Sequence, residues 1–434
     1  MLTWGTATSG VRTSGDLTSG ASGTLTSGNC AEAGPAARAR RAAVASEAGS
    51  PARRMRRTRA ADERCTAPNG SSFRRDKRGL GPAHLSVKPR RALPEHGLGS
   101  TRVRVAAVQL EPVIGDVAAN LESCERLVDA AAQQDADWIV LPEFFTTGMA
   151  FRDELAGAAL APDGAATALM RELASRHGAT VGGSFLCRDP DGEVRNAFLL
   201  FDGDGTLLGR HDKDLPTMWE NAFYVGGSDD GLLEAGQLAV GVALCWELMR
   251  APTARRLRGR VDLVVGGSCW WSLPLWPPAS VTRRWEAANA RTAALVTERF
   301  ARLVGAPVVH AAHMGSVSCP LPGTPLRYRG EYQGGAVVAD GHGRVLARRT
   351  REEGPGLAVA EIEPGSVPPL DAIPDRFWLH DRGPVPAALW HHQRAQGRLW
   401  YRRHTRGKAP LEVERTPLEH RDGPVAEEAG RPDS

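Results

Sequence analysis

The stretch RVRVAAVQLEPVIGDVAANLESCERLVDAAAQQDADWIVLPE, residues 102–143, decides the fold class. Its first nine residues alternate and are rich in valine, which predicts a strand. Between 120 and 134, apolar residues recur three or four positions apart, which predicts a helix with one buried face. The run WIVLPE, 138–143, is short and apolar and reaches a proline, which predicts a buried strand. This order of strand, helix and strand indicates a sheet covered by helices.

The same mixture of elements continues to about residue 363. Gly178 ends a predicted helix over 165–177, and further helices are expected over 249–258 and 281–303. Between them the sequence predicts strands over 180–186, 195–202, 206–213, 232–236, 238–245, 261–267, 307–312, 334–340, 343–349 and 356–363. We therefore expect an α+β or α/β sandwich in which helices cover the sheets.

The composition is that of a soluble globular protein. The 434 residues exceed one ordinary core, so one large domain with appendages, or two domains, is expected. No apolar run reaches the roughly 18 residues of a membrane helix, and no secretory signal is visible. The seven cysteines are scattered and form no C-x-x-C pair. Their pattern favours reduced thiols and a cytoplasmic location over a disulfide framework.

Residues 1–100 differ from the rest of the chain. They repeat Thr-Ser-Gly and then become rich in Ala and Arg, so we expect a disordered, low-complexity leader. They hold 17 Lys and Arg against 7 Asp and Glu, whereas the whole chain holds 54 against 50, which leaves 101–434 with a net charge of −6. A solvated tail or an overlong reading frame is favoured over a nucleic-acid tether or an organellar transit peptide.

The region from 366 to 434 is rich in Pro, Arg and aromatic residues. We expect it to form an extended arm that packs on the core or on a partner subunit, with a frayed end after about residue 408. The expected organisation is therefore a leader over 1–100, a main domain over 101–365 and a partly disordered arm over 366–434.

Three residues that suit catalysis end predicted strands, namely Glu143, Lys213 and Cys245. Side chains and loops converge on functional sites at such strand ends. A thiol nucleophile needs a base, and a buried carboxylate whose pKa rises toward neutrality can serve. A lysine ammonium and a backbone N–H can stabilise the oxyanion that forms when a carbonyl is attacked. Taken singly, the three residues can equally be a loop acid, a surface lysine and a core cysteine.

Together, the motifs LPEFF, HDKDLP and ALCWE resemble, in order and spacing, those of the nitrilase (carbon–nitrogen hydrolase) superfamily. The opening segment, with Gln109, Asp116 and Asn120, resembles the first strand and helix of that superfamily. The resemblance covers about 103–365. It implies a four-layer αββα sandwich that pairs through its α faces into homodimers or higher homo-oligomers.

The resemblance also implies roles for the site residues. Glu143 would be the general base, Cys245 the nucleophile and Lys213 the oxyanion stabiliser of a thioester mechanism without cofactor or metal. Glu220 stands where the superfamily has a second glutamate, although it can also be an ordinary loop acid. The backbone N–H of Trp246 is a second candidate for the oxyanion.

The segment SCWW, 268–271, follows a predicted strand. Trp270 and Trp271 are candidates for the walls of a substrate pocket, and a place in the core is equally expected for them. Cys269 lacks an identifiable base. His310 and His313 lack partners at ligand spacing, so a structural role is favoured for both.

Small-molecule amides are the favoured substrates because PEFFTTGM resembles the corresponding segment of ω-amidase-like members. A nitrilase that converts a nitrile to a carboxylic acid and ammonia is the alternative, since Cys245-Trp246-Glu247 is closer to true nitrilases. A non-catalytic binding protein on the same scaffold is the third possibility. Neither a membrane nor a nucleic acid is expected as a partner.

Overall fold

The computed structural model describes residues 102–274, 276–375 and 384–414. The predicted leader over 1–100 and the chain after 414 lie outside these residues. Within them, twelve strands form one sheet: β1 (Val103–Leu110), β2 (Trp138–Val140), β3 (Thr180–Arg188), β4 (Val194–Phe201), β5 (Leu207–Asp212), β6 (Leu232–Ala235), β7 (Leu238–Val242), β8 (Leu263–Ser268), β9 (Val308–His313), β12 (Ala336–Ala339), β13 (Val345–Arg349) and β14 (Gly356–Ile362). The strands β10 (Ser316–Pro320) and β11 (Arg327–Glu331) form a separate hairpin.

Five α-helices are described: α1 (Val117–Ala132), α2 (Ala165–His177), α3 (Ala251–Leu257), α4 (Ala279–Val304) and α5 (Pro384–Trp400). Asp116 caps α1 by accepting a hydrogen bond from the backbone N–H of Ala119. Gly178 and Gly305 end α2 and α4 in the left-handed conformation, which glycine adopts without steric cost. These three helix boundaries therefore lie where local chemistry favours them.

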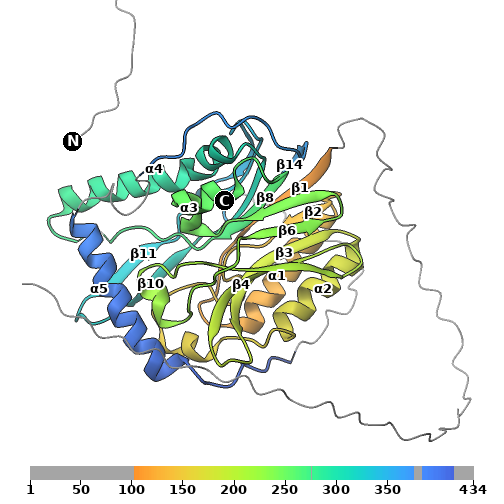
Figure 1. Cartoon of the computed structure of the whole chain (residues 1–434). Coiled ribbons are helices and arrows are strands. Elements are labelled where there is room, and N and C mark those ends of the chain that lie inside the picture. The colour runs from red at the N-terminus through yellow and green to blue at the C-terminus, as the bar shows by residue number, and fades with distance from the viewer. Residues whose placement is uncertain (1–101, 275, 376–383, 415–434) are drawn as a thin grey trace, which may run out of the picture. The chain divides into compact units, whose positions relative to one another are not determined.

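The sheet has the order β5-β4-β3-β2-β1-β9-β8-β7-β6, and its two halves face each other across an apolar interior. Side chains of β1 alternate between two layers: Val105 and Ala107 enter this interior, while Ala106 and Val108 pack toward α1 and α2. A further cluster joins β8 to α3 and α4. Figure 1 shows α1 and α2 on one side of the strands and α3 and α4 on the other. The predicted four-layer αββα sandwich is confirmed.

Strand direction places several strand ends at one edge. The strands β1, β2 and β3 are parallel, and β7, β8 and β9 are parallel to β1. The strand β4 is antiparallel to both β3 and β5, so β5 runs with the others. The carboxyl ends of β2, β5, β7 and β8 therefore lie at the same end of the sandwich, which is where ligands bind in many sheets of this kind.

The structure corrects the sequence interpretation at three places. Strands β2 and β7 end three residues earlier than predicted, because Glu143 and Cys245 lie in the loops that follow them. The hairpin of β10 and β11 was not predicted. The arm is not extended over 384–400 but forms α5, whose Trp390 and Gln393 side chains are buried against the core.

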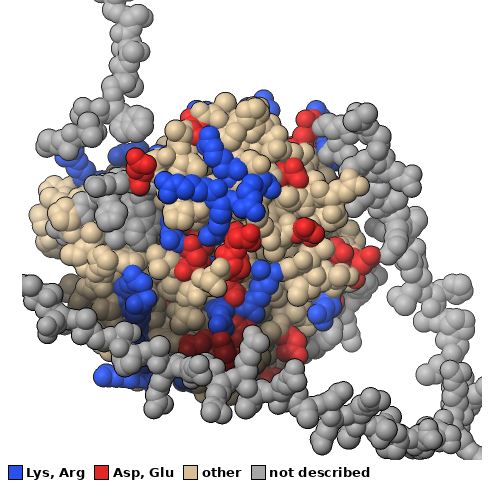
Figure 2. All heavy atoms as spheres, in the orientation of Figure 1, with Lys and Arg blue, Asp and Glu red and all other residues tan. Residues whose placement is uncertain are grey.

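Charged side chains of both signs are neighbours on the surface. Figure 2 shows Lys and Arg side chains lying beside Asp and Glu side chains on the face drawn there. Ion pairs such as Arg195 with Asp191 and Arg210 with Asp212, each at 2.7 Å, are examples among the described residues. No helix in the described segments is both long enough and apolar enough to cross a membrane.

Candidate active site

The three residues predicted from the strand ends lie in neighbouring loops at the edge where the carboxyl ends meet. Glu143 follows β2, Lys213 follows β5 directly, and Cys245 follows β7. Glu143 and Lys213 have no solvent-exposed surface, and Cys245 is 2% exposed. The Nζ atom of Lys213 lies 2.7 Å from Oε1 of Glu143. The parallel strand ends thus bring together a carboxylate and an ammonium group that are 70 residues apart in the sequence.

Glu143 is held by three donors. Besides Lys213, the Nδ2 atom of Asn196 donates to its Oε1 at 2.9 Å, and the backbone N–H of Cys269 donates to its Oε2 at 3.0 Å. The main-chain carbonyl of Glu143 also lies 2.7 Å from Nε2 of His313. Every one of these partners comes from a different strand or strand end, so the carboxylate has a fixed position and orientation.

Glu220 supplies a second carboxylate to the same lysine. It lies in the short 3₁₀ helix η2 (Met218–Ala222), and its Oε2 accepts hydrogen bonds from Nζ of Lys213 at 2.9 Å and from the hydroxyl of Tyr224 at 2.5 Å. The same oxygen accepts from the backbone N–H of Thr217, which is a capping-box contact. The predicted second glutamate therefore lies in the site, in contact with Lys213.

The buried charges change the proton affinities of the three groups. Burial raises the pKa of Glu143 to about 7, although the Lys213 ammonium opposes the shift; the Glu220 carboxylate adds to it. Burial alone would lower the pKa of Lys213, but Glu143 and Glu220 outweigh it and hold that pKa above its usual range. Burial and the charge of Glu143 raise the pKa of the Cys245 thiol. A neutral thiol thus lies within the electrostatic influence of a carboxylate that is a base near pH 7.

Cys245 begins the 3₁₀ helix η3 (Cys245–Met249) in a strained conformation, with φ at +49°. Phe144, next to Glu143, and Met218, which begins η2, have φ at +54° and +49°. A left-handed conformation of such residues costs on the order of 1–3 kcal/mol and is found mostly at functional sites. Three separate loops at this edge are therefore strained at residues that adjoin or belong to the candidate site.

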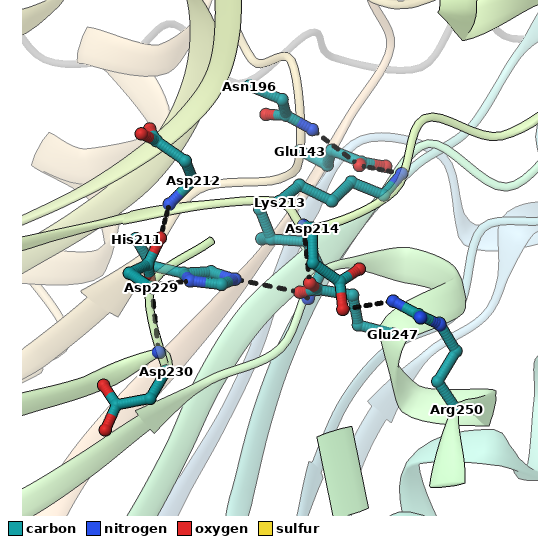
Figure 3. Close-up of polar contacts among 12 residues, drawn as sticks. Glu143, Asn196, His211, Asp212, Lys213, Asp214, Asp229, Asp230, Glu247 and Arg250 are labelled. Carbon is teal, nitrogen blue, oxygen red and sulfur yellow. Dashed lines mark hydrogen bonds and ion pairs between the residues drawn. The ribbon is translucent and has the colours of Figure 1, made fainter. Parts of the chain in front are cut away.

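Glu247 joins two of these loops (Figure 3). Its Oε2 accepts a hydrogen bond from the backbone N–H of Leu244, and its Oε1 accepts one from the backbone N–H of Asp214. Leu244 directly precedes Cys245, and Asp214 directly follows Lys213. One buried carboxylate thus fixes the position of the cysteine loop relative to the lysine loop.

His211, two residues before Lys213, contacts Glu247. Its Nε2 lies 3.0 Å from Glu247, and its Nδ1 lies 2.5 Å from Asp229. Burial lowers the pKa of His211, but the two carboxylates outweigh it and raise that pKa to about 10. Asp214 pairs with Arg250 on the other side (Figure 3). The motif His-Asp-Lys-Asp, which can be read as a surface cluster, therefore contains buried supporting groups.

The three tryptophans singled out in the sequence are buried beside the site. Trp246 and Trp270 have ring centroids 5.9 Å apart, and Trp270 donates from Nε1 to Asn289. Trp271 stacks on Trp219, the residue before Glu220, at 4.4 Å. They belong to the cluster of apolar side chains that includes Cys245. Their location is compatible with both roles considered for them, pocket wall and core.

Several contacts of the site were not found from the sequence. Asn196 in a strand, the backbone N–H of Cys269, and the side chains of Tyr224 and Glu247 carry no local signal that points to Glu143 or Lys213. The sequence pattern Thr217-x-x-Glu220, typical of a capping box, could have suggested the capping contact of Glu220.

The two histidines considered in the sequence, His310 and His313, are buried, and burial lowers the pKa of each to about 4. No group of His, Cys, Asp and Glu in the described segments is arranged to hold a metal ion.

Comparison with known proteins shows the family of the chain. Residues 104–370 match the model of the carbon–nitrogen hydrolase family. The chain is 29% identical over 264 residues to the omega-amidase YafV of Yersinia enterocolitica, which covers 60% of this chain and 89% of the relative. It is 28% identical over 190 residues to a nitrilase of Pyrococcus abyssi, which covers 42% of this chain and 71% of that protein.

A solved structure, a double mutant of the amidase from Nesterenkonia sp. AN1 in complex with acrylamide, aligns with a TM-score of 0.49 and 21% identity. That alignment covers 65% of this chain and 97% of the amidase. Because the family model matches more than half of the chain, the protein belongs to the carbon–nitrogen hydrolase family of enzymes.

Proposed function

We propose that the protein hydrolyses the carbon–nitrogen bond of a small amide through a thioester on Cys245. The observation that supports this most is the buried contact between Glu143 and Lys213, together with burial that raises the pKa of Glu143 to about 7 and keeps the nearby Cys245 thiol neutral. A general base is most effective when its pKa lies near the working pH. The reaction requires such a base twice, once for the thiol and once for water.

In the first half of the reaction, Glu143 takes the proton of Cys245, and the thiolate attacks the amide carbon. The carbonyl oxygen becomes an oxyanion beside the Lys213 ammonium and the backbone N–H of Trp246. The carbon–nitrogen bond then breaks, and Glu143 returns the proton to the departing ammonia or amine. Glu220 keeps Lys213 in place and charged during these steps, because its carboxylate lies 2.9 Å from Nζ.

In the second half, Glu143 takes a proton from water, and the resulting hydroxide attacks the thioester carbon. Collapse of the second oxyanion breaks the carbon–sulfur bond and releases the carboxylic acid, while the proton returns to the sulfur. A nitrile can react with the same residues: the thiolate adds to its carbon, and two waters are consumed before the carboxylic acid and ammonia leave. The nitrilase among the relatives supports this second candidate.

The experiment is an assay of ammonia release from a panel of ω-amides, carbamoyl compounds and nitriles. We expect turnover of at least one amide and a loss of at least about 10⁴-fold in Cys245→Ala, as is typical when a covalent nucleophile is removed. Cys124→Ala is the matched control, because Cys124 is similarly buried but lies on the inner face of α1. Full activity of Cys245→Ala would overturn the mechanism, and turnover of nitriles alone would favour the second candidate.

Two further predictions concern the whole protein. A homodimer or higher homo-oligomer is expected from the resemblance and is tested by light scattering of the purified chain. A cytoplasmic location remains a prediction from the cysteine pattern.

A further inference from the structure

The arm after residue 383 adds a support to the site that lies outside the residues matched by the family model. We define the arm as α5 together with the π-helical turn η6 (Tyr401–Thr405), and the family match ends at residue 370. Figure 1 shows α5 beside the hairpin of β10 and β11. Gln393 anchors it there by donating from Nε2 to the carbonyl of Pro322 at 3.2 Å.

The arm packs directly on η2, the helix that carries Glu220. Gly397 of α5 lies so close to it that a Cβ atom at this position would be 2.9 Å from Cβ of Asn221 and 3.0 Å from the backbone N of Ala222. Thr405 of η6 donates from its hydroxyl to the carbonyl of Ala222 at 2.6 Å. Asn221 and Ala222 are the two residues after Glu220, so the contact is with the backbone of the Glu220 segment itself.

The arm also holds the start of β4, the strand that carries Asn196. The hydroxyl of Tyr401 donates to Oε2 of Glu193 at 2.6 Å and accepts from the backbone N–H of Val194 at 2.9 Å. Arg188, at the end of β3, donates to the carbonyl of Thr405 at 2.9 Å. The arm therefore contacts both segments that place partners around Glu143 and Lys213.

The η2 helix needs such support. It is one short 3₁₀ turn, a structure with poor hydrogen-bond geometry, and it begins at the strained residue Met218. Only one carboxylate oxygen of Glu220 carries its hydrogen bonds, while Oε1 is buried without a partner in the described structure. The position of Glu220 therefore depends on how firmly the backbone of η2 is held from outside.

We propose that the arm is a positioning element for Glu220, which buttresses η2 through Gly397 and Thr405 and so keeps the second carboxylate on Lys213. The proposal rests on the proposed function only in taking Glu220 as part of the site. If the arm yields, Glu220 moves away from Lys213, and Glu143 loses a negative neighbour.

The pH dependence of the site reports such a movement. The ionisable groups that face Glu143 are Lys213 after β5, Glu220 and Tyr224 from the η2 segment, Cys245 in η3, Cys269 after β8 and His313 in β9. Among these groups, Glu220 belongs to the segment that the arm contacts through Asn221 and Ala222. Because the charge of Glu220 raises the pKa of Glu143, displacement of Glu220 lowers the pH at which Glu143 becomes a base.

The test compares Gly397→Ala with Leu399→Ala, a change on the exposed side of the same helix. Both variants and the wild type are treated with iodoacetamide from pH 5 to pH 9, and alkylation of Cys245 is followed by peptide mass spectrometry. In Gly397→Ala we expect the pH midpoint of alkylation to fall by at least half a unit, toward that of Glu220→Gln. We expect kcat/KM on any substrate found to drop about 100-fold, as a misplacement of about 1 Å can cause. Leu399→Ala should match the wild type.

A Gly397→Ala variant with an unchanged pH midpoint would overturn the proposal, even if its Tm fell, because the arm would then be purely structural. If this variant does not fold, Thr405→Val decides, since it removes the hydrogen bond to Ala222 at nearly constant volume. It should shift the midpoint in the same direction by a smaller amount, and no shift would again overturn the proposal. Alkylation needs no substrate, so failure of the proposed function in the substrate panel remains distinguishable from failure of this inference.

Discussion

The interior between the two halves of the sheet and the interior at their carboxyl ends are both shielded from water, yet they are built from opposite kinds of side chain. The first is apolar, with Val105, Leu200 and Leu263 fully buried. The second contains Glu143 and Lys213, also fully buried. Burial stabilises the first by about 25 cal/mol per Å² of apolar surface, whereas it penalises the second unless each charge is paired.

The difference shows that the site depends on the layers beneath it as well as on its own contacts. Every charged group there has several partners, and those partners come from separate strands whose spacing the apolar interior fixes. The predictions that follow change one region at a time, and they are ordered by their expected effect on turnover.

Replacing Lys213 by Met should have the largest effect. It leaves two buried carboxylates without their cation, which costs about 3–5 kcal/mol of folding free energy, and it removes the proposed oxyanion donor, which would be worth about 10²–10³ in kcat. Urea unfolding and steady-state kinetics measure the two losses. Lys408→Met, the same change at an exposed lysine, is the control. A Lys213→Met enzyme of wild-type stability would contradict the view that these charges depend on one another.

Lowering the pH of the wild-type enzyme should cause the next largest loss of kcat/KM. Since the pKa of Glu143 is raised to about 7, kcat/KM should fall about tenfold per pH unit below that value. A stability effect of defined sign accompanies it. Between about pH 4.5 and 7 the folded protein keeps the proton of Glu143 and the unfolded chain releases it, so stability relative to Glu143→Gln should decrease as pH rises through this window. A kcat/KM profile that is flat from pH 5 to 8 would be incompatible with Glu143 as the base.

Replacing Leu263 by Ala should lower stability without changing turnover of the folded enzyme. Leu263 is fully buried in the interior of the sheet, and loss of such a side chain costs about 2–5 kcal/mol. Leu207→Ala, at an exposed position of β5, should cost far less. Thermal unfolding and kcat measured well below Tm separate the two quantities. A large fall in kcat would show that the apolar interior and the site are coupled more tightly than the contacts indicate.

The smallest effect is expected at a surface ion pair. Arg126 and Glu122 lie 2.8 Å apart on α1, and both side chains are more than half exposed. Such pairs contribute about 0.3–0.5 kcal/mol. Arg126→Ala should therefore change Tm by little and kcat/KM not at all, which calorimetry and kinetics can check. A destabilisation above 1 kcal/mol would place this pair with the buried charges instead.

Periodicity in the sequence predicted sheets covered by helices, because it reports which face of an element is buried, whereas the four-layer arrangement came from the resemblance to the superfamily. The sequence also pointed to Glu143, Lys213 and Cys245, since each follows a recognisable strand. The supporting groups escaped notice for a physical reason. Asn196 reaches Glu143 across 53 positions, and Glu247 binds the loop of Lys213 across 33 positions to Asp214, so their roles exist only once the strands pair.

The prediction of an extended arm failed for a different reason. Its Pro and Arg content favoured an extended chain, but Trp390 and Tyr401 are buried, and that burial rewards a helix that local composition argues against. Its aromatic residues were considered in the sequence only as part of the composition of the segment.

The left-handed backbone at Phe144, Met218 and Cys245 has a consequence for engineering and for evolution. Glycine at 144 or 218 would adopt this backbone without strain, but it would also remove a buried Phe or Met side chain, whose loss costs about 2–5 kcal/mol. The strain is therefore held in place by the packing of the same residues that carry it. Selection for heat resistance alone should leave positions 144 and 218 unchanged and accumulate its substitutions elsewhere.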